Sequence, residues 1–177
     1  MTREIACACG TVRLEIRGDP IVSAECYCNS CRAAAARIAA LPGAAGILNP
    51  AGGTRFVLFR KDRVRILAAA DRIRTFTLTP EASTKRAVAT CCNTPVWLEF
   101  KGGHWLSLYG ALWHEGMLPP LEVRTMTKDL PDPSVLPDDG LNARSQTMGF
   151  FWRLFRAWAA MGFRNPKTAE IEGELDV

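Results

Sequence analysis

Three cysteines lie close together in the first part of the chain. Cys26, Cys28 and Cys31 form the pattern Cys-x-Cys-x-x-Cys within six residues. Thiolates at this spacing can converge on one ion, because a tight turn brings three sulfurs within reach of zinc–sulfur bonds of ~2.3 Å. Three protein ligands would leave one coordination position open, as in catalytic zinc sites. The triplet therefore predicts a metal site that can accept an incoming ligand.

Four further cysteines form a second group. Cys7 and Cys9 flank a single residue and are followed by Gly10, which permits the close backbone turn of a metal knuckle. Cys91 and Cys92 lie far along the chain and can close this pair into a four-sulfur site. Sulfur-only tetrahedral coordination favours zinc, with iron–sulfur chemistry as the second choice. We therefore expect Zn²⁺, one or two ions per chain.

The alternative is that the seven cysteines are buried core residues, since free cysteine is among the most buried residue types. Scattered positions would fit that interpretation, whereas these cysteines form short-spaced groups.

The N-terminus has no apolar signal region and no segment has the ~18 apolar residues of a spanning helix, so we expect a cytoplasmic protein. Thiols stay reduced there, which favours metal over disulfides.

Composition excludes several classes of protein. Hydrophobic residues make up 48% and charged residues 23% of the 177 residues, which is typical of a soluble globular protein and excludes disordered and fibrous chains. The 22 Lys and Arg outnumber the 18 Asp and Glu by only four. This excess is too small to indicate nucleic-acid binding, and no nucleic-acid partner is expected.

The elements that position the cysteines are mostly strands. Short runs rich in β-branched and aromatic residues, punctuated by turns, predict a mainly β fold. A helix is expected over Asn29–Leu41, directly after the triplet, because this stretch is rich in alanine and is followed by Pro42 and Gly43. Strands are expected over 11–17, 21–25, 56–59, 64–67, 73–78, 85–92, 96–100, 106–112 and 121–126.

The chain changes character after residue 127. We expect a β domain over 1–127, then a proline-rich linker or wrapping loop over 128–147 that is not part of a sheet. The last part, 148–177, is expected to hold an amphipathic helix over Met148–Phe163 and a loose acidic tail over Glu170–Val177. His104 and His114 are interpreted as structural histidines rather than ligands or bases.

The C-terminal helix has an aromatic face that cannot stay in water. It could pack on its own domain and cover part of the zinc cleft, or it could pair with a second copy in a homodimer. It could also lie on a membrane surface, because Trp and Phe flanked by Arg are typical of interfacial helices. Packing within the protein or in a dimer is the commoner outcome.

Three blocks of the sequence resemble a known family. They are Cys7-Ala-Cys-Gly-Thr-Val12, Cys26-Tyr-Cys-Asn-Ser-Cys-Arg32 and Cys92-Asn-Thr-Pro-Val96. These look like the signature blocks of the glutathione-dependent formaldehyde-activating (Gfa-like) family, which includes centromere protein V, and the resemblance runs from about residue 5 to 100. It implies a β-rich, tent-like fold with a structural zinc site and a catalytic zinc site, the latter held by the triplet.

The chain departs from the family pattern at the distal block. Ala89 stands where the family has the first cysteine of a Cys-x-x-Cys motif, and an additional cysteine, Cys91, directly precedes the second. Neighbouring side chains on a strand point to opposite faces, so Cys91 and Cys92 reach one ion only if the chain turns there. Cys92 is assigned to the structural site with Cys7 and Cys9, and Cys91 is left open as its fourth ligand. Asn93 can adopt the positive φ that glycine usually supplies.

The donor set favours thiol chemistry. Three thiolates give zinc a net charge near −1, which weakens it as a Lewis acid and suits it to binding an incoming thiol. The resemblance implies joining glutathione with formaldehyde, or the reverse carbon–sulfur cleavage. Cations should offset the negative charge, Arg32 first and then Lys85 and Arg86. The alternative function is a non-catalytic zinc-stapled module that uses the C-terminal helix to bind a second copy, another partner or a membrane.

Overall fold

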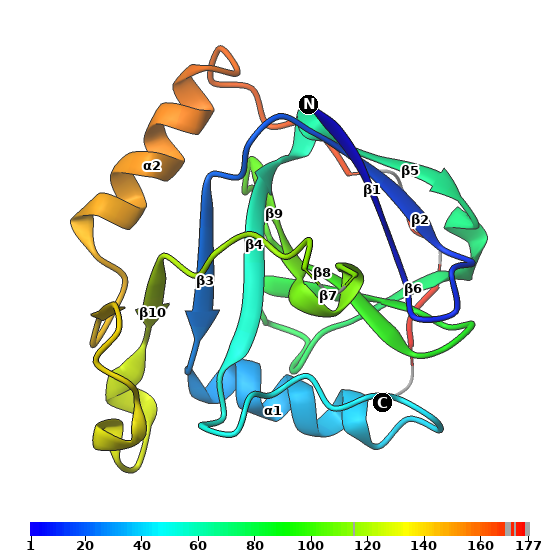
Figure 1. The fold of residues 1–177 in the computed structure, drawn as a ribbon. Helices are drawn as coiled ribbons and strands as arrows, with labels where there is room; N and C mark the ends of the chain where they lie inside the picture. The colour runs from blue at the N-terminus through cyan, green and yellow to red at the C-terminus, as the bar shows by residue number, and fades with distance from the viewer. Residues whose placement is uncertain (115, 169–170, 172, 176–177) are drawn as a thin grey trace.

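The computed structural model describes residues 1–114, 116–168, 171 and 173–175. Over these residues the fold is mainly β with two α-helices, which confirms the predicted fold class (Figure 1). A small antiparallel sheet has the strand order β1-β2-β5. Its strands are β1 (Thr2–Ala6), β2 (Arg13–Arg17) and β5 (Val64–Ala68).

A larger sheet has the order β11-β10-β3-β4-β9-β8-β7-β6. It is antiparallel except that β10 pairs in parallel with both β3 and β11. The strands are β3 (Val22–Cys26), β4 (Thr54–Arg60), β6 (Ile73–Phe76), β7 (Thr84–Ala89), β8 (Thr94–Phe100), β9 (Trp105–Tyr109), β10 (Val123–Thr125) and β11 (Leu141–Asn142). Short 3₁₀ helices span Lys61–Arg63, Ala70–Arg72, Gly110–Leu112, Thr127–Asp129 and Pro133–Val135.

The main hydrophobic core lies between the two sheets. Leu14 and Ile16 of β2 are buried and belong to it, while Arg13 and Arg17 on the same strand are exposed. This alternation is the one predicted for a half-buried strand. Phe59, Trp97 and Leu108 bring β4, β8 and β9 into the same core. The small sheet therefore covers one face of the large one.

Helix α1 (Asn29–Ala39) starts directly after the cysteine triplet and ends two residues earlier than expected. Cys28 is its N-cap, with the sulfur accepting a hydrogen bond from the Cys31 backbone N–H at 3.3 Å. Ala34 and Ile38 are buried against the large sheet. Figure 1 shows α1 below the ends of β3 and β4, so the triplet lies where strand and helix meet.

Residues 128–147 differ from the expectation in one detail. The prediction that this segment contains no sheet element is wrong at Leu141–Asn142, which form β11 and pair with β10. Arg124 of β10 fixes the segment, because its guanidinium donates to Asp139 Oδ1 at 2.6 Å and its carbonyl accepts from the Ala143 N–H at 2.8 Å. The boundaries expected at 127 and 147 stay predictions.

The C-terminal tail is fixed where the structure describes it. The expectation of a loose tail is wrong for residues 173–175, because the Leu175 N–H donates to the Thr75 carbonyl at 2.8 Å and Glu174 bridges to Thr75 of β6. The rest of that expectation, at 170, 172, 176 and 177, lies outside the described residues.

Helix α2 (Met148–Ala159) stands beside β3 on the outside of the large sheet (Figure 1). Leu154 is its one fully buried residue, and its carbonyl accepts a hydrogen bond from His104 Nε2 at 2.9 Å. The His104 ring also stacks on Trp158, which supports its interpretation as a structural histidine. Among the described residues, no helix has the length and apolar character required to cross a bilayer.

Candidate metal centre

The triplet is built by the junction of β3 and α1. Cys26 is the last residue of β3, Cys28 is extended at the N-cap, and Cys31 lies in the first helical turn. The change from strand to helix folds the three side chains back on one another, and their sulfurs all lie within 4.8 Å. The structure therefore brings together the three residues that the spacing singled out.

Tyr27 anchors this junction from the inside. Its side chain is buried, its hydroxyl donates to Glu25 Oε2 at 2.8 Å, and it accepts from Asn49 Nδ2 at 3.1 Å. Gly53 packs so closely on the ring that an added Cβ would lie 2.6 Å from Tyr27 Cζ. A rigid Tyr27 holds Cys26 and Cys28 on either side of it.

Hydrogen bonds among the three cysteines shift the pKa values of their thiols. The pKa of Cys28 is lowered to about 2, because Cys26 and Cys31 both donate hydrogen bonds to its sulfur. The pKa of Cys26 is correspondingly raised to about 11, first by its bond to Cys28, and that of Cys31 is also raised, first by its bond to Cys26. In the absence of a cation, the Cys28 thiolate accepts hydrogen bonds from the Cys26 and Cys31 thiols. A metal ion would let all three ionise.

Arg86 is the buried cation at this site. It lies on β7, its side chain is only 1% exposed, and it lines the same cavity as the triplet. One guanidinium nitrogen donates to Ser30 Oγ at 2.8 Å, between Cys28 and Cys31 in the sequence. Among the described residues no carboxylate forms an ion pair with Arg86. The cysteines are therefore the candidate counter-charge of a buried cation.

Arg32 is placed differently. Its guanidinium donates to Asn29 Oδ1 at 2.6 Å and to the Asp129 carbonyl at 2.8 Å, and it is not among the residues that line the cavity. These bonds fasten α1 to the segment after β10. The role of Arg32 as a cation for the thiolates stays a prediction. Lys85 is exposed and lines a different cavity.

A cavity of about 480 Å³ opens beside the triplet, and all three cysteines line it. Its walls come from β3, β4, β7, β8, β9, β10, α1 and α2, so the C-terminal helix does cover part of the cleft. Phe56, Leu98 and Leu154 belong to one hydrophobic cluster with Cys31. The sequence patterns did not single out these wall residues, because their meeting depends on strand order. The aromatic face of α2 was the one available signal.

The second cluster joins the β1–β2 loop to the β7–β8 turn. Cys7 Sγ lies 3.5 Å from Cys9 Sγ and 3.7 Å from Cys91 Sγ, and Cys9 and Cys91 are 3.4 Å apart. Cys92 Sγ lies 3.9 Å from Cys91 Sγ, and all four sulfurs are within 4.8 Å of one another. The structure thus brings the Cys91 sulfur to the other three, and its role as the fourth ligand stays a prediction.

A turn over Thr90–Asn93 makes this possible. Strand β7 ends at Ala89, and Asn93 adopts φ 54°, the positive value expected for it. The chain therefore turns at the vicinal pair, and both thiols face Cys7 and Cys9. Ala89 itself is buried in the core.

Hydrogen bonds tune the thiols of the second cluster. The pKa of Cys9 is lowered to about 6, first by its side-chain bond to Thr11. Burial raises the pKa of Cys7 and, to about 12, that of Cys91. Burial opposes ionisation of Cys92, but its pKa is also lowered, because a hydrogen bond to Thr94 favours its thiolate. A cation would let the two thiols with raised pKa values ionise as well.

The sulfur distances test whether zinc fits. A tetrahedral ion with zinc–sulfur bonds of ~2.3 Å places its ligands about 3.8 Å apart. Four of the sulfur–sulfur separations in the second cluster, Cys7–Cys9, Cys7–Cys91, Cys9–Cys91 and Cys91–Cys92, are 3.4 to 3.9 Å and bracket this value. Backbone N–H groups of Val12 and Cys31 also donate to Cys7 and Cys28. Both clusters could hold a metal ion, and the donor set suits zinc.

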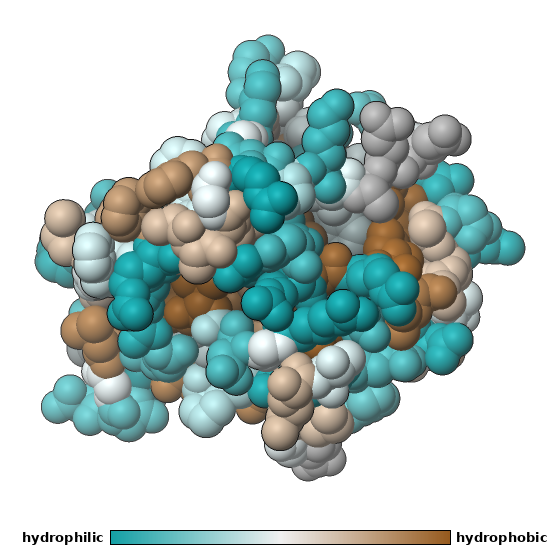
Figure 2. Space-filling view, turned by 90° about the horizontal axis from the view of Figure 1, so that it is seen from above, coloured by the Kyte–Doolittle hydropathy of each residue, from teal (hydrophilic) through white to brown (hydrophobic). Residues whose placement is uncertain are grey.

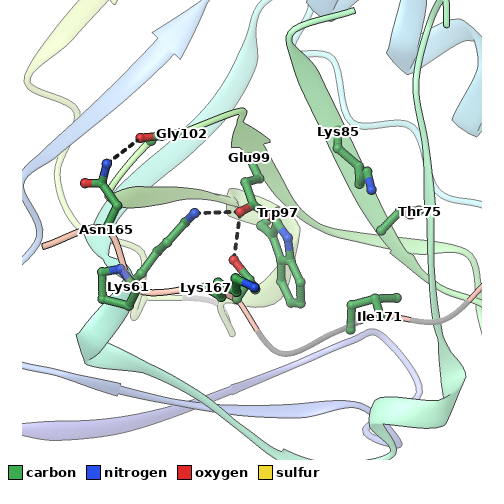
Figure 3. A pocket seen from close by; sticks show the side chains of 12 residues that line it. Lys61, Thr75, Lys85, Trp97, Glu99, Gly102, Asn165, Lys167 and Ile171 are labelled. Carbon is green, nitrogen blue, oxygen red and sulfur yellow. Dashed lines mark hydrogen bonds and ion pairs between the residues drawn. The ribbon is translucent and has the colours of Figure 1, made fainter.

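A further cavity of about 530 Å³ has a different character (Figure 3). It lies between the large sheet and the C-terminal segment and is lined by no cysteine. Lys61 is paired with Glu99 at 2.6 Å, Thr168 donates to the same carboxylate, and Asn165 donates to the Gly102 carbonyl. Its polar groups thus hold the C-terminal segment in place.

Comparisons with known proteins bear on the N-terminal part of the chain. The model of the family described as glutathione-dependent formaldehyde-activating enzyme matches residues 2–45. A solved structure of a Rhodobacter sphaeroides protein is 17% identical, covers 66% of this chain and 92% of its own, and has a TM-score of 0.45. No curated protein matches the chain with significance. The chain is therefore similar, over the residues 2–45 that hold Cys7, Cys9 and the triplet, to the glutathione-dependent formaldehyde-activating enzyme family, as its cysteine motifs predict.

Proposed function

We propose that this protein binds one zinc ion at each cysteine cluster and that the triplet site binds a small thiol or its aldehyde adduct. The observation that carries the proposal is that Cys26, Cys28 and Cys31 all line one cavity, whereas the second cluster joins two loops. When bound, zinc would stabilise an incoming thiol as thiolate at its open position. The second site would stabilise the fold by linking the β1–β2 loop to the β7–β8 turn. Reduced thiols suit a cytoplasmic location.

The reaction that fits this site is carbon–sulfur cleavage of an S-hydroxymethyl thiol adduct, as the family name suggests for S-hydroxymethylglutathione. The carbon–sulfur bond breaks, the hydroxyl oxygen loses its proton and becomes the formaldehyde carbonyl, and the proton leaves on the thiol. The reverse reaction joins the same two molecules. The buried Arg86 guanidinium offsets the charge of the thiolates while this occurs.

Exchange spectroscopy by NMR tests the activity. A thiol premixed with formaldehyde exchanges slowly with its S-hydroxymethyl adduct, and the zinc-loaded protein is expected to accelerate this exchange. Cys28→Ser should abolish the acceleration, because it removes a triplet thiolate. Equal acceleration by Cys28→Ser and the parent protein would contradict the proposal. Glutathione and 1-butanethiol are both used, so that activity is not missed through the choice of thiol.

The exposed aromatic side chains of α2 favour a second candidate function, association with a second copy of the chain. Phe151, Trp152 and Phe155 are 53%, 59% and 46% exposed on this helix. Aromatic side chains exposed together are typical of interfaces. Analytical ultracentrifugation of the parent and of Trp152→Glu is the test. A dimer that dissociates in the variant supports association, and a monomeric parent at high concentration contradicts it. A membrane contact would instead show as pelleting of the monomer with anionic vesicles.

A further inference from the structure

The walls of the triplet cavity are mostly apolar. Phe56 and Leu98 come from the large sheet, and Phe150 and Leu154 come from α2 on the opposite side. The cavity volume of about 480 Å³ lies within the range of sites for small organic ligands. On the face seen in Figure 2, apolar side chains likewise gather in recesses between hydrophilic ones. A ligand that buries an apolar group against the walls of the triplet cavity gains binding free energy.

Charged partners are scarce in this cavity. Apart from the cysteines, Arg86 is the one lining residue with an ionisable side chain among the described residues. Two of its nitrogens donate to Ser30 and Thr84, and its Nε is buried without a hydrogen-bond partner. Arg86 is therefore the one cationic side chain among the described lining residues that could pair with an anionic group of a ligand.

A peptide thiol such as glutathione does not match these walls. It carries two carboxylates and one ammonium at neutral pH. Burying a charge without a partner is strongly unfavourable, so these groups would have to remain in solvent while only the thiol entered. An alkyl or aryl thiol has no such requirement and gains by filling the cavity.

We infer that the ligand of the triplet site is a thiol, or the aldehyde adduct of a thiol, that carries an apolar group and at most one anionic group. The inference rests on the proposed thiol-binding function and narrows its substrate class. The sulfur binds at the triplet, and the apolar group lies between the sheet and α2. Phe151, which lines the cavity from α2 and is half-exposed, borders the ligand.

Calorimetric titration of the zinc-loaded protein with a series of thiols tests the inference. Ethanethiol, 1-butanethiol and 1-hexanethiol are expected to bind more tightly in this order, by about fourfold for each added methylene that is buried. Glutathione is expected to bind at least tenfold more weakly than 1-hexanethiol. A flat series, or glutathione binding as tightly as 1-hexanethiol, overturns the inference and leaves the thiol site in place.

Two variants of α2 form a matched pair. Phe151→Ala removes a half-exposed ring that lines the cavity, and Phe155→Ala removes a half-exposed ring of the same helix that does not. Phe151→Ala should weaken 1-hexanethiol binding about tenfold and ethanethiol binding much less, while Phe155→Ala leaves both unchanged. Equal effects of the two variants overturn the placement of the apolar group.

Thiol binding by Cys28→Ser distinguishes a failure of the apolar-ligand inference from a failure of the proposed thiol-binding function. Loss of all thiol binding in this variant, with a chain-length trend in the parent, supports both. If 1-hexanethiol binds Cys28→Ser as tightly as the parent, the sulfur does not bind at the triplet and the inference is wrong. If no thiol, glutathione included, binds the zinc-loaded parent, the proposed function itself fails.

Discussion

At the scale of single residues, Cys28 has two separate tasks. Its sulfur accepts the backbone N–H of Cys31 as the N-cap of α1, and the same sulfur has the lowered pKa of the triplet. A serine hydroxyl is also a good N-cap but a poor zinc ligand. The two tasks can therefore be separated by substitution.

Cys28→Ser is expected to keep the helix and lose the metal of the triplet. Circular dichroism should match that of the parent, while the zinc content falls by about one ion per chain. Cys28→Ala should lose the metal and in addition about 1 kcal/mol of stability, because it also removes the cap. Unchanged zinc content in Cys28→Ser would show that the triplet is not a metal site.

Gly53 is required by the Tyr27 ring rather than by backbone conformation. Gly53→Ala would place a Cβ within 2.7 Å of two ring carbons that are themselves buried. We expect a loss of about 1–3 kcal/mol in the free energy of unfolding, because the ring must shift. Denaturant titration measures this loss. Gly52→Ala is the less informative neighbour, since Gly52 has φ 84° and is strained by any side chain.

At the scale of elements, Leu154 and Trp158 attach α2 to the large sheet through His104. Leu154 is buried, and the His104 ring donates to its carbonyl and stacks on Trp158. Burial lowers the pKa of His104 from its ordinary value of about 6.5, and the nearby charges of Lys61 and Arg60 lower it further. The folded protein therefore holds His104 neutral.

This pKa shift predicts a pH dependence of stability. Below about pH 6.5 the unfolded chain binds a proton at His104 that the folded chain excludes, so the free energy of unfolding decreases as the pH falls. The decrease ends once the pH is below the lowered pKa of the folded state. Denaturant titrations between pH 7 and pH 5 should show it, and His104→Gln should remove that part of the slope. An identical slope in both proteins would contradict the assignment.

The elements also show how far the sequence predicts the fold. Strand β2 and helix α1 were predictable because their periodicity and their Gly and Pro boundaries are local signals. Strand β1 was not predicted, and β11 was wrongly excluded, because a two-residue strand exists only through its pairing with β10. Cys91 could not be assigned as a ligand from the sequence, because the position of its sulfur depends on the turn that follows β7.

At the scale of the whole molecule, the two cysteine clusters hold different parts of the fold. The second cluster links residues 84 positions apart and fastens the small sheet to the turn between β7 and β8. The triplet instead links β3 to α1 and faces the cavity. Loss of metal from the second cluster should loosen the sheets, whereas loss of metal from the triplet should affect ligand binding first.

The most direct test of this account is the number of zinc ions per chain, measured by elemental analysis of protein purified without added metal or chelator. The account predicts about two in the parent, and about one in both Cys28→Ser and Cys91→Ser. A folded parent with no zinc would contradict it. A parent with one zinc that survives Cys28→Ser would contradict the proposed thiol site, because the triplet would then be empty.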